Sequence, residues 1–143
     1  MDQLQSAITK LKSLKYLALT IRAPDLISDV WLNQLKSVLA SLASLQDLYL
    51  NFRGCHQISD IGLACLQSAL EPLSSLQNLE LVFSSCCAIS NEGLDYLQSA
   101  LISLSSLHHV SLDFSKCNGI SVERLNHLRI ELQLIPSLEI TQE

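Results

Sequence analysis

The residues best able to bind a metal or take part in catalysis are five cysteines and four histidines. Three of the cysteines recur at a fixed interval. Cys55, Cys86 and Cys117 stand 31 residues apart, so a repeating structure would stack them in a column. A metal site needs ligands that converge on one point, whereas a column supplies a ladder of thiols. We therefore expect a structural ladder of buried cysteines, in which each weak S–H donor satisfies a backbone carbonyl and no metal is bound.

The histidines and serines give no pattern of a catalytic site. His108 and His109 are adjacent, and neighbours on a strand point to opposite faces, so their imidazoles would not share a metal. No serine lies in a GxSxG context, and GxGxxG and P-loop spacings are absent from the sequence. The sequence therefore predicts a non-enzymatic protein without catalytic residues or cofactors, in which His109 is a contact residue.

The elements that position these residues belong to a repeated unit. The phrase LKYLALTI at 14–21 returns as LQDLYLNF at 45–52, LQNLELVF at 76–83 and LHHVSLDF at 107–114. A fixed period of this length is typical of solenoids. We therefore expect one domain over 1–143, with repeats at 14–44, 45–75, 76–106 and 107–137. Residues 1–13 would be a partial N-terminal repeat helix, and 138–143 the C-terminal end.

Within each unit the spacing of apolar residues changes, from every second residue to about every 3.6 residues. The opening phrase alternates apolar and polar residues, as a half-buried strand does, and leucines spaced by three and four follow, as on one stripe of a helix. A serine suited to an N-cap precedes each helix: Ser28, Ser59, Ser90 and Ser121. Acidic residues at Asp29, Asp60 and Glu92 would meet the positive end of the helix dipole.

Stacking such units must give a curved molecule. Strands stack about 4.8 Å apart, whereas a helix with its side chains is about 10 Å wide. We therefore expect an α/β solenoid with a parallel sheet on the concave face and helices on the convex face.

The motif resembles a known family. LxxLxL, followed by a loop and ISDxGLxxLxxAL, resembles the leucine-rich repeat of the ribonuclease-inhibitor type, and CHQISDIGLACL is similar to the cysteine-containing repeats of F-box substrate receptors. The 31-residue unit looks most like ciliate leucine-rich repeat arrays. The resemblance implies a right-handed horseshoe segment that binds proteins. The chain departs from the family pattern at one position of the turn, where the family has asparagine. Here that position is Pro24 in the first repeat and Cys55, Cys86 and Cys117 in the others. The sequence shows no F-box or catalytic domain that would support a ligase or kinase role.

The residues whose side chains are expected to point outward from the concave face differ in every copy, while the leucines between them repeat. Tyrosine and arginine, which are favoured at binding hot spots, are among these positions. A solvated sheet face is the alternative interpretation. The candidate partner-binding residues are Tyr16, Thr20, Arg22, Asp47, Tyr49, Asn51, Arg53, Asn78, Glu80, Val82, His109, Ser111 and Asp113.

Composition narrows the functional classes. The net charge is −5 and no basic stripe is present, which argues against nucleic-acid binding. No apolar run reaches the roughly 18 residues of a membrane helix. An odd number of cysteines without a CxxC pair indicates reduced thiols in a cytoplasmic compartment, where disulfides are not expected.

The ends of the array suggest further contacts. Leu4, Ile8 and Leu11 match only the helix of a preceding unit, and Leu134, Ile135, Leu138 and Ile140 predict a last helix running into a partial fifth strand. A partner that covers the ends, self-association, or membership of a longer array would explain them. Residues 1–53 carry six Lys/Arg and four Asp/Glu, whereas 54–143 carry three and ten, and this charge split favours head-to-tail contact between open ends.

Three functions are consistent with these features. The first is a protein-interaction module that binds through the concave strand face. The alternatives are a structural subunit of a larger ciliary or organellar assembly, and a regulator of a GTPase or hydrolase.

Overall fold

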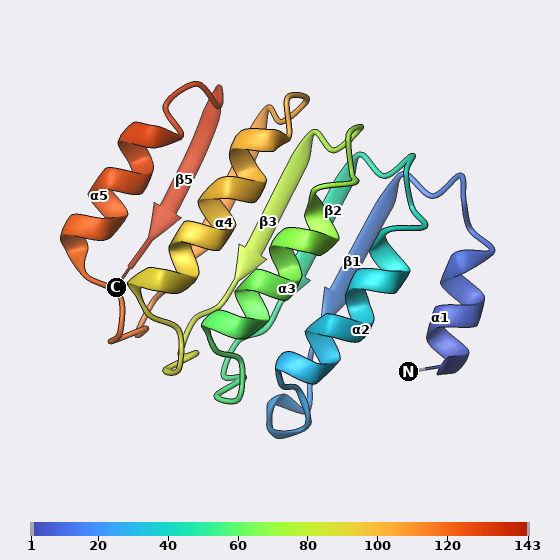
Figure 1. Cartoon of the computed structure of the whole chain (residues 1–143), viewed down its shortest axis with the longest axis horizontal. Helices are drawn as coiled ribbons and strands as arrows, with labels where there is room; N and C mark the ends of the chain where they lie inside the picture. Colours follow the sequence, from blue (N-terminus) through green and yellow to red (C-terminus); the bar gives the residue numbers. More distant parts are fainter. Residues whose placement is uncertain (1, 143) are drawn as a thin grey trace.

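The structure, a computed structural model, describes residues 2–142, except for the side chains of Leu4, Ile8 and Thr9. Five parallel strands form one sheet, in the order in which they follow one another along the chain. A row of helices covers one face of this sheet (Figure 1). The strands are β1 (Tyr16–Thr20), β2 (Asp47–Asn51), β3 (Asn78–Val82), β4 (His109–Asp113) and β5 (Ser137–Thr141).

The helices alternate with these strands, as the sequence predicted. They are α1 (Asp2–Thr9), α2 (Asp29–Leu39), α3 (Asp60–Leu70), α4 (Asn91–Ser103) and α5 (Val122–Glu131), with a short 3₁₀ turn η1 (Pro24–Leu26) before α2. The molecule is an α/β leucine-rich repeat solenoid, with the sheet on the concave face and the helices on the convex face. None of the helices among residues 2–142 has the length and apolarity to cross a bilayer.

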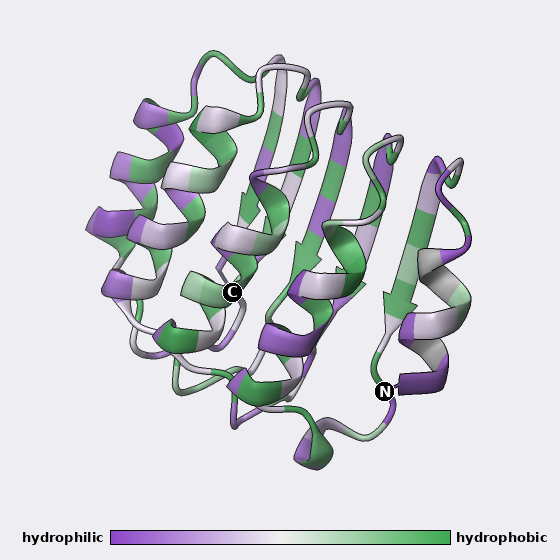
Figure 2. Ribbon diagram, turned by 45° about the vertical axis from the view of Figure 1, so that its right-hand side comes forward, coloured by the Kyte–Doolittle hydropathy of each residue, from purple (hydrophilic) through white to green (hydrophobic). Residues whose placement is uncertain are grey.

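The core is a stack of identical apolar layers. Leu48 and Leu50 of β2 lie directly beside Leu79 and Leu81 of β3, and all four are buried. The colouring of Figure 2 shows the resulting alternation of hydrophobic and hydrophilic residues along the strands. Because burying one leucine contributes about 1.5–3 kcal/mol, each additional layer stabilises its neighbour.

An aromatic column follows the strands. The rings of Phe52 and Phe83 stack with centroids 5.4 Å apart, and those of Phe83 and Phe114 stack at 5.8 Å. In the first repeat this position is Ile21, and Trp31 instead packs edge-on against Phe52 at 5.9 Å. The indole of Trp31 therefore closes the N-terminal end of the aromatic column.

A polar ladder joins the starts of the helices. The carboxylate of Asp29 accepts hydrogen bonds from the N–H of Ser59 at 2.8 Å and from its hydroxyl at 2.6 Å. Asp60 makes the same pair of bonds with Ser90 at the same distances. An acidic residue expected only to meet the helix dipole thus also fixes the N-cap serine of the next repeat.

The ladder continues once more and then ends. Asn91 accepts from the N–H of Ser121 at 2.9 Å and donates to its hydroxyl at 3.3 Å. Each oriented serine in turn accepts from its own helix, whereas Ser28 is an N-cap by position but makes no such side-chain bond. Among the described residues, no acidic side chain is hydrogen-bonded to Ser28 in the way that Asp29 is to Ser59. Val122 occupies the next ladder position and has no polar group to offer.

Two glycines leave room for this ladder. A Cβ at Gly62 would collide with the Asp29 carboxylate and would lie 2.8 Å from Leu32 Cδ1. A Cβ at Gly93 would collide with the Asp60 carboxylate in the same way. Glycine at this position of the ISDxGL motif therefore leaves space for the acidic side chain of the preceding repeat.

The two ends differ from the inner repeats. The predicted fifth strand forms as β5, which contains Leu138 and Ile140. The last helix ends at Glu131, before Leu134, which is 92 % exposed, so the expectation that this helix includes Leu134 was wrong. Pro136 gives a physical reason, because the residue before a proline is pushed away from helical geometry. At the other end α1 forms, but Leu4 and Ile8 lie outside the described side chains. The repeat boundaries at 14, 45, 76, 107 and 138 stay predictions.

Asp60 provides a test of the polar ladder. Replacing Asp60 with alanine removes both acceptors of Ser90, and we expect a loss of about 1–3 kcal/mol in the free energy of unfolding. Asp60→Asn is the matched control, because asparagine already fills this role at position 91 and should retain most of the stability. Urea titration measures both variants. Equal stability of Asp60→Ala and the parent protein would contradict the role of the ladder.

Candidate protein-binding face

The candidate binding face is the side of the sheet opposite the helices. In each strand the first, third and fifth residues are more exposed than the two between them, so one set of side chains leaves the sheet on this side. The structure places the candidate residues on β1 to β4, with Arg22 and Arg53 exposed just beyond β1 and β2. The candidates on the strands therefore share one side of the sheet.

Strand register arranges these residues in rows across the sheet. Tyr16, Asp47, Asn78 and His109 lie side by side and form the first row. The third row consists of Thr20, Asn51, Val82 and Asp113. Between them lies a row made of Ala18, Tyr49, Glu80 and Ser111. A partner would thus meet a different residue at each step across the sheet.

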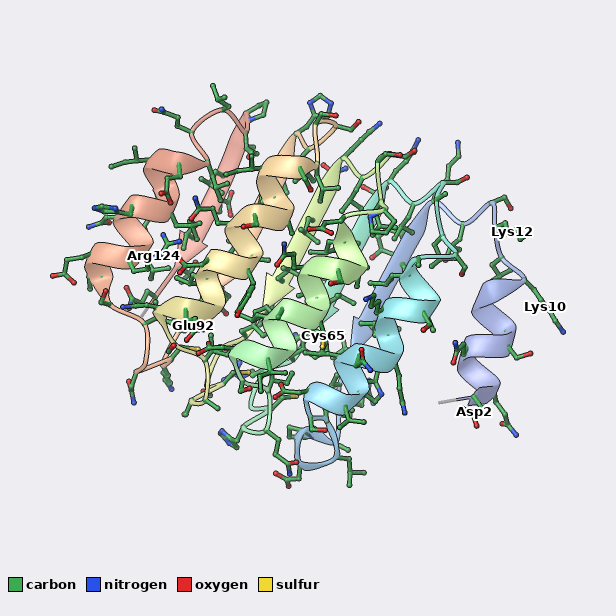
Figure 3. The ribbon with its side chains drawn as sticks, in the orientation of Figure 1. Asp2, Lys10, Lys12, Cys65, Glu92 and Arg124 are labelled. Carbon is green, nitrogen blue, oxygen red and sulfur yellow. The ribbon has the colours of Figure 1, made fainter. Side chains whose placement is uncertain are left out.

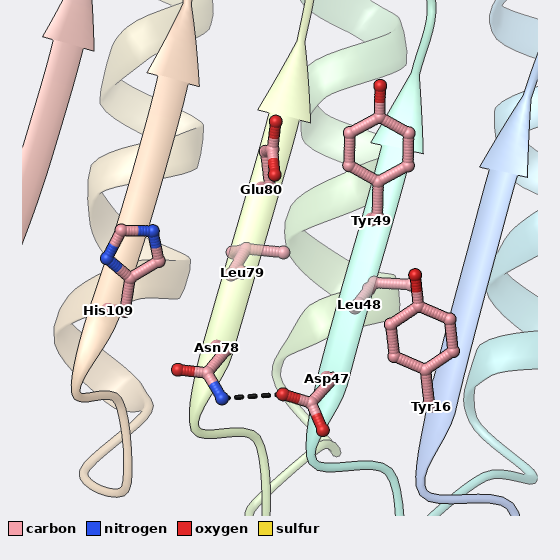
Figure 4. Close-up of a pocket in the computed structure, with 8 residues that line it drawn as sticks. All are labelled: Tyr16, Asp47, Leu48, Tyr49, Asn78, Leu79, Glu80 and His109. Atoms are coloured by element: carbon pink, nitrogen blue, oxygen red, sulfur yellow. Dashed lines mark hydrogen bonds between the residues drawn. The ribbon is translucent and has the colours of Figure 1, made fainter.

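A shallow hollow lies at the centre of this face. Its walls are the side chains of Tyr16, Asp47, Tyr49, Asn78, Glu80 and His109, and its floor contains Leu48 and Leu79 (Figure 4). The hollow has a volume of about 150 Å³. Small-molecule pockets usually span about 300–1,000 Å³, so this one is suited to a single protruding side chain of a larger partner.

Hydrogen bonds between side chains hold part of this surface in place. Asn78 donates to the Asp47 carboxylate across neighbouring strands (Figure 4). Asn51 donates to the Tyr49 hydroxyl at 2.9 Å and accepts from the N–H of Arg53 at 3.0 Å. A fixed Tyr49 ring loses less side-chain entropy when a partner covers it, which favours binding.

The far edge of the face is held in the same way. Nδ1 of His109 lies 2.9 Å from the Ser137 hydroxyl on β5, and the Asp113 carboxylate accepts from the N–H and hydroxyl of Ser115. Ser137 and Glu139 were missed as candidate residues, although both are exposed on this face. β5 begins 28 residues after β4 (137 − 109), so it falls outside the 31-residue register. Leu138 and Ile140 predicted the strand itself, but the outward-facing residues between them were not among the candidates.

Charge is unevenly distributed over the face. One carboxylate stands on each of β2 to β5, from Asp47, Glu80, Asp113 and Glu139. The positive charges within three residues of these strands are Lys15, Arg22 and Arg53 at β1 and β2, and Lys116 after β4. The surface is therefore acidic toward β5 and more basic at the ends of β1 and β2.

The cysteine column lies in the turns after the strands. Cys55, Cys86 and Cys117 are buried free thiols. Cys86 Sγ donates to the carbonyl of Phe52 at 3.2 Å, and Cys117 Sγ donates to that of Phe83 at 3.1 Å. The Phe52 carbonyl also accepts from the N–H of Cys55 at 3.0 Å, so one oxygen links two consecutive repeats.

The residue before each of these cysteines has a left-handed backbone. Gly54, Ser85 and Lys116 have φ values of 76°, 62° and 61°. Only the first is a glycine, the residue that adopts this conformation without steric cost. The N–H groups of Gly54 and Ser85 donate to Ser84 and Ser115 of the next repeat, which offsets the cost of the unusual conformation.

Burial makes these thiols unreactive. It raises the pKa of Cys55 to about 11, with a smaller contribution from the charge of Asp25. It also raises the pKa of Cys86 to about 12, with added contributions from Cys117 and Cys55, and raises the pKa of Cys117 as well. The thiolate is the nucleophilic form, so these three cysteines are poor nucleophiles near neutral pH. Cys65 is half-buried and Cys87 is exposed.

Other chemistry finds little support among the described residues. In residues 2–142 no group of three His, Cys, Asp or Glu side chains is placed to hold a metal ion. Figure 3 shows Cys65 and Glu92 on separate helices and Arg124 toward the α5 end. Arg124 forms ion pairs with Asp95 at 2.8 Å and with Glu131 at 3.3 Å, and thus links α5 to α4.

Comparison with known proteins bears on the fold. No family model matches the sequence, and no curated protein matches it. Among solved structures, the chain is similar to one titled "Leiomodin-1 Actin-Binding Site 2 (ABS2)". The TM-score is 0.71 at 14 % identity, over 99 % of this chain and 78 % of that one. The neighbour is a leucine-rich repeat domain, which agrees with the fold described above.

Thiol labelling tests the cysteine column. In the folded protein at neutral pH, iodoacetamide should modify Cys87 first and Cys65 more slowly, while the three column thiols should react only after unfolding, because burial keeps them protonated. Mass spectrometry of tryptic peptides identifies the modified sites, with urea-unfolded protein as the control. Rapid modification of Cys86 in the folded protein would contradict this assignment.

Proposed function

We propose that this chain is a non-enzymatic protein-interaction module that binds a partner protein through the concave face of its sheet. One observation carries the proposal. The core-facing residues of β1 to β4 are nearly the same in every repeat, whereas their outward-facing neighbours differ in every repeat. Layer packing fixes the buried residues, and the exposed ones are free to match a partner.

Residue types on the face support this proposal. Tyr16 is 62 % exposed, and Tyr49 stands beside the central hollow with its hydroxyl already bonded. Tyrosine and arginine are enriched at binding hot spots, and Arg53 follows Tyr49 closely in the chain. A protruding side chain of the partner would enter the hollow between the two tyrosines.

The size of the face limits how a partner can bind. Five strands of five residues cover about 17 by 19 Å, or about 320 Å², from strand rise and spacing. A stable interface usually covers about 800 Å² on each partner. We therefore expect either weak binding or a partner that also contacts the surrounding loops.

Actin is the first named partner to test, because the similar structure is titled an actin-binding site. Co-sedimentation with actin filaments would measure this directly. The cysteine-containing, ribonuclease-inhibitor-like repeat type, the likeness to ciliate arrays and a cytoplasmic location stay predictions from the sequence.

A structural subunit of a larger assembly is the second candidate. Apolar residues at both ends of the sheet, such as Leu17, Leu19, Leu138 and Ile140, are only partly buried, unlike their counterparts in the inner strands. A subunit held by its ends would keep its place in the assembly when the concave face is mutated.

The double variant Tyr49→Ala/Arg53→Ala tests the concave face. We expect at least about a tenfold loss of affinity for the partner, since each hot-spot residue typically contributes more than about 1 kcal/mol. The matched control is Ile61→Ala/Lys36→Ala, which removes one large side chain and one positive charge from exposed helix positions. Proteins captured by the immobilised chain, and actin separately, would be titrated against both variants. Equal binding by the two would contradict the proposal.

A further inference from the structure

The two edge strands expose backbone groups that point outward. Asp47 N–H donates to the Lys15 carbonyl and Ile21 N–H donates to the Asn51 carbonyl, so alternate residues of β1 pair with β2. The N–H and C=O groups of Tyr16, Ala18 and Thr20 therefore face the outer edge. No strand among residues 2–142 pairs with this edge or with the outer edge of β5. Unpaired edges of this kind readily accept another strand.

The elements at the two ends are complementary halves of a repeat. Within the described residues, α1 has no strand before it and β5 has no helix after it. The connection from α1 to β1 resembles those of the inner repeats: Thr9 precedes Tyr16 by seven residues (16 − 9), and Leu70 precedes Asn78 by eight (78 − 70). Relative to the strand that follows it, helix α1 is thus placed like the helix of an inner repeat.

Apolar residues at these ends are less covered than their counterparts inside. Leu11 is 49 % exposed, whereas Leu42 and Leu73, at the same repeat position, are fully buried. On β5, Leu138 and Ile140 are only partly buried, although the equivalent residues of β4 are buried. Covering this surface would add the layer contacts that the inner repeats already have.

The charges of the two ends are opposite. Residues 1–22 contain Lys10, Lys12, Lys15 and Arg22 against Asp2, a net charge of +3. Residues 122–143 contain four glutamates and two arginines, a net charge of −2. Lys10 and Lys12 extend from the end of the molecule beyond β1 (Figure 3), and the α1–β1 and α5–β5 connections lie along the same edge of the solenoid (Figure 1). Stacking end to end would bring lysines close to the connection that follows Glu131.

We propose that the C-terminal end of one chain binds the N-terminal end of a second copy. Strand β5 of the first copy pairs in parallel with β1 of the second, and α1 of the second covers the inner face of β5. The strand and helix then form one complete repeat across the junction. Because the two surfaces differ, the contact is heterologous and leaves a free end on each copy, so association continues beyond a dimer.

Arg129 is placed to moderate this contact. Its guanidinium donates to the Ile140 carbonyl at 2.9 Å. Ser137 N–H donates to His108 and Phe114 N–H donates to Thr141, so Ile140 is one of the β5 residues that face the outer edge. Arg129 therefore occupies an acceptor that an incoming β1 would use. Its removal should strengthen association, both by freeing the acceptor and by making the end more acidic.

Sedimentation velocity on the purified chain tests the proposal. At low salt, the average mass should rise with concentration and pass twice the monomer mass without levelling, and added salt should reduce it because the charge attraction is screened. A chain that stays monomeric at high concentration, or a dimer that grows no further, would overturn the proposal.

Variants at the edge separate strand pairing from other association. Ala18→Pro removes an outward N–H without affecting the bonds to β2, and edge strands tolerate proline at such positions. It should abolish association, while Ala18→Thr, which keeps the N–H, should associate like the parent. Lys12→Glu/Lys15→Glu, at two exposed positions, should also reduce association, and Arg129→Ala should increase it.

Association of Ala18→Pro equal to that of the parent, or weaker association of Arg129→Ala, would exclude pairing through this edge. If Ala18→Pro fails to fold, the lysine variant and the mass series of the parent still decide. Because all these positions differ from Tyr49 and Arg53, failure of this proposal would leave the concave-face proposal intact.

Discussion

Each repeat of this protein depends on the next repeat to bury its leucines. A single strand and helix expose one apolar face, and only a neighbouring copy with the same face in the same register covers it. Leu48, Leu79 and Val110 stack side by side for this reason, and all are buried. The regular core in turn holds the strands parallel and places their outer residues on one surface. The candidate binding face therefore follows from core packing.

Polar ladders fix the spacing that the leucines alone leave open. The Asp29–Ser59 and Asp60–Ser90 pairs join successive helix starts, and the Phe52 carbonyl joins Cys55 to Cys86 in the turns. These bonds satisfy buried or half-buried polar groups that each repeat could not satisfy alone. They also explain why the cysteines serve structure: a thiol that donates to a carbonyl in a dry turn is held protonated.

Much of this arrangement could be predicted from the sequence because a repeat multiplies weak local signals. The strand positions and the N-cap serines followed from period and spacing alone. Contacts between repeats could not be predicted in the same way. The aspartate of one unit and the serine of the next are 30 residues apart, and only the stacking brings them together. Likewise Ser85 and Lys116 carry no signal of their left-handed backbone, since neither is a glycine. The exposed residues of β5 were missed because its spacing departs from the period.

The stability of the solenoid comes from contact between neighbouring repeats, so it should be greatest in the middle and least at the ends. Hydrogen exchange of individual amides measures this directly. We predict the slowest exchange for amides paired between β2, β3 and β4, and progressively faster exchange toward α1 and β5. Equal protection from end to end, or the strongest protection at α1, would contradict the account.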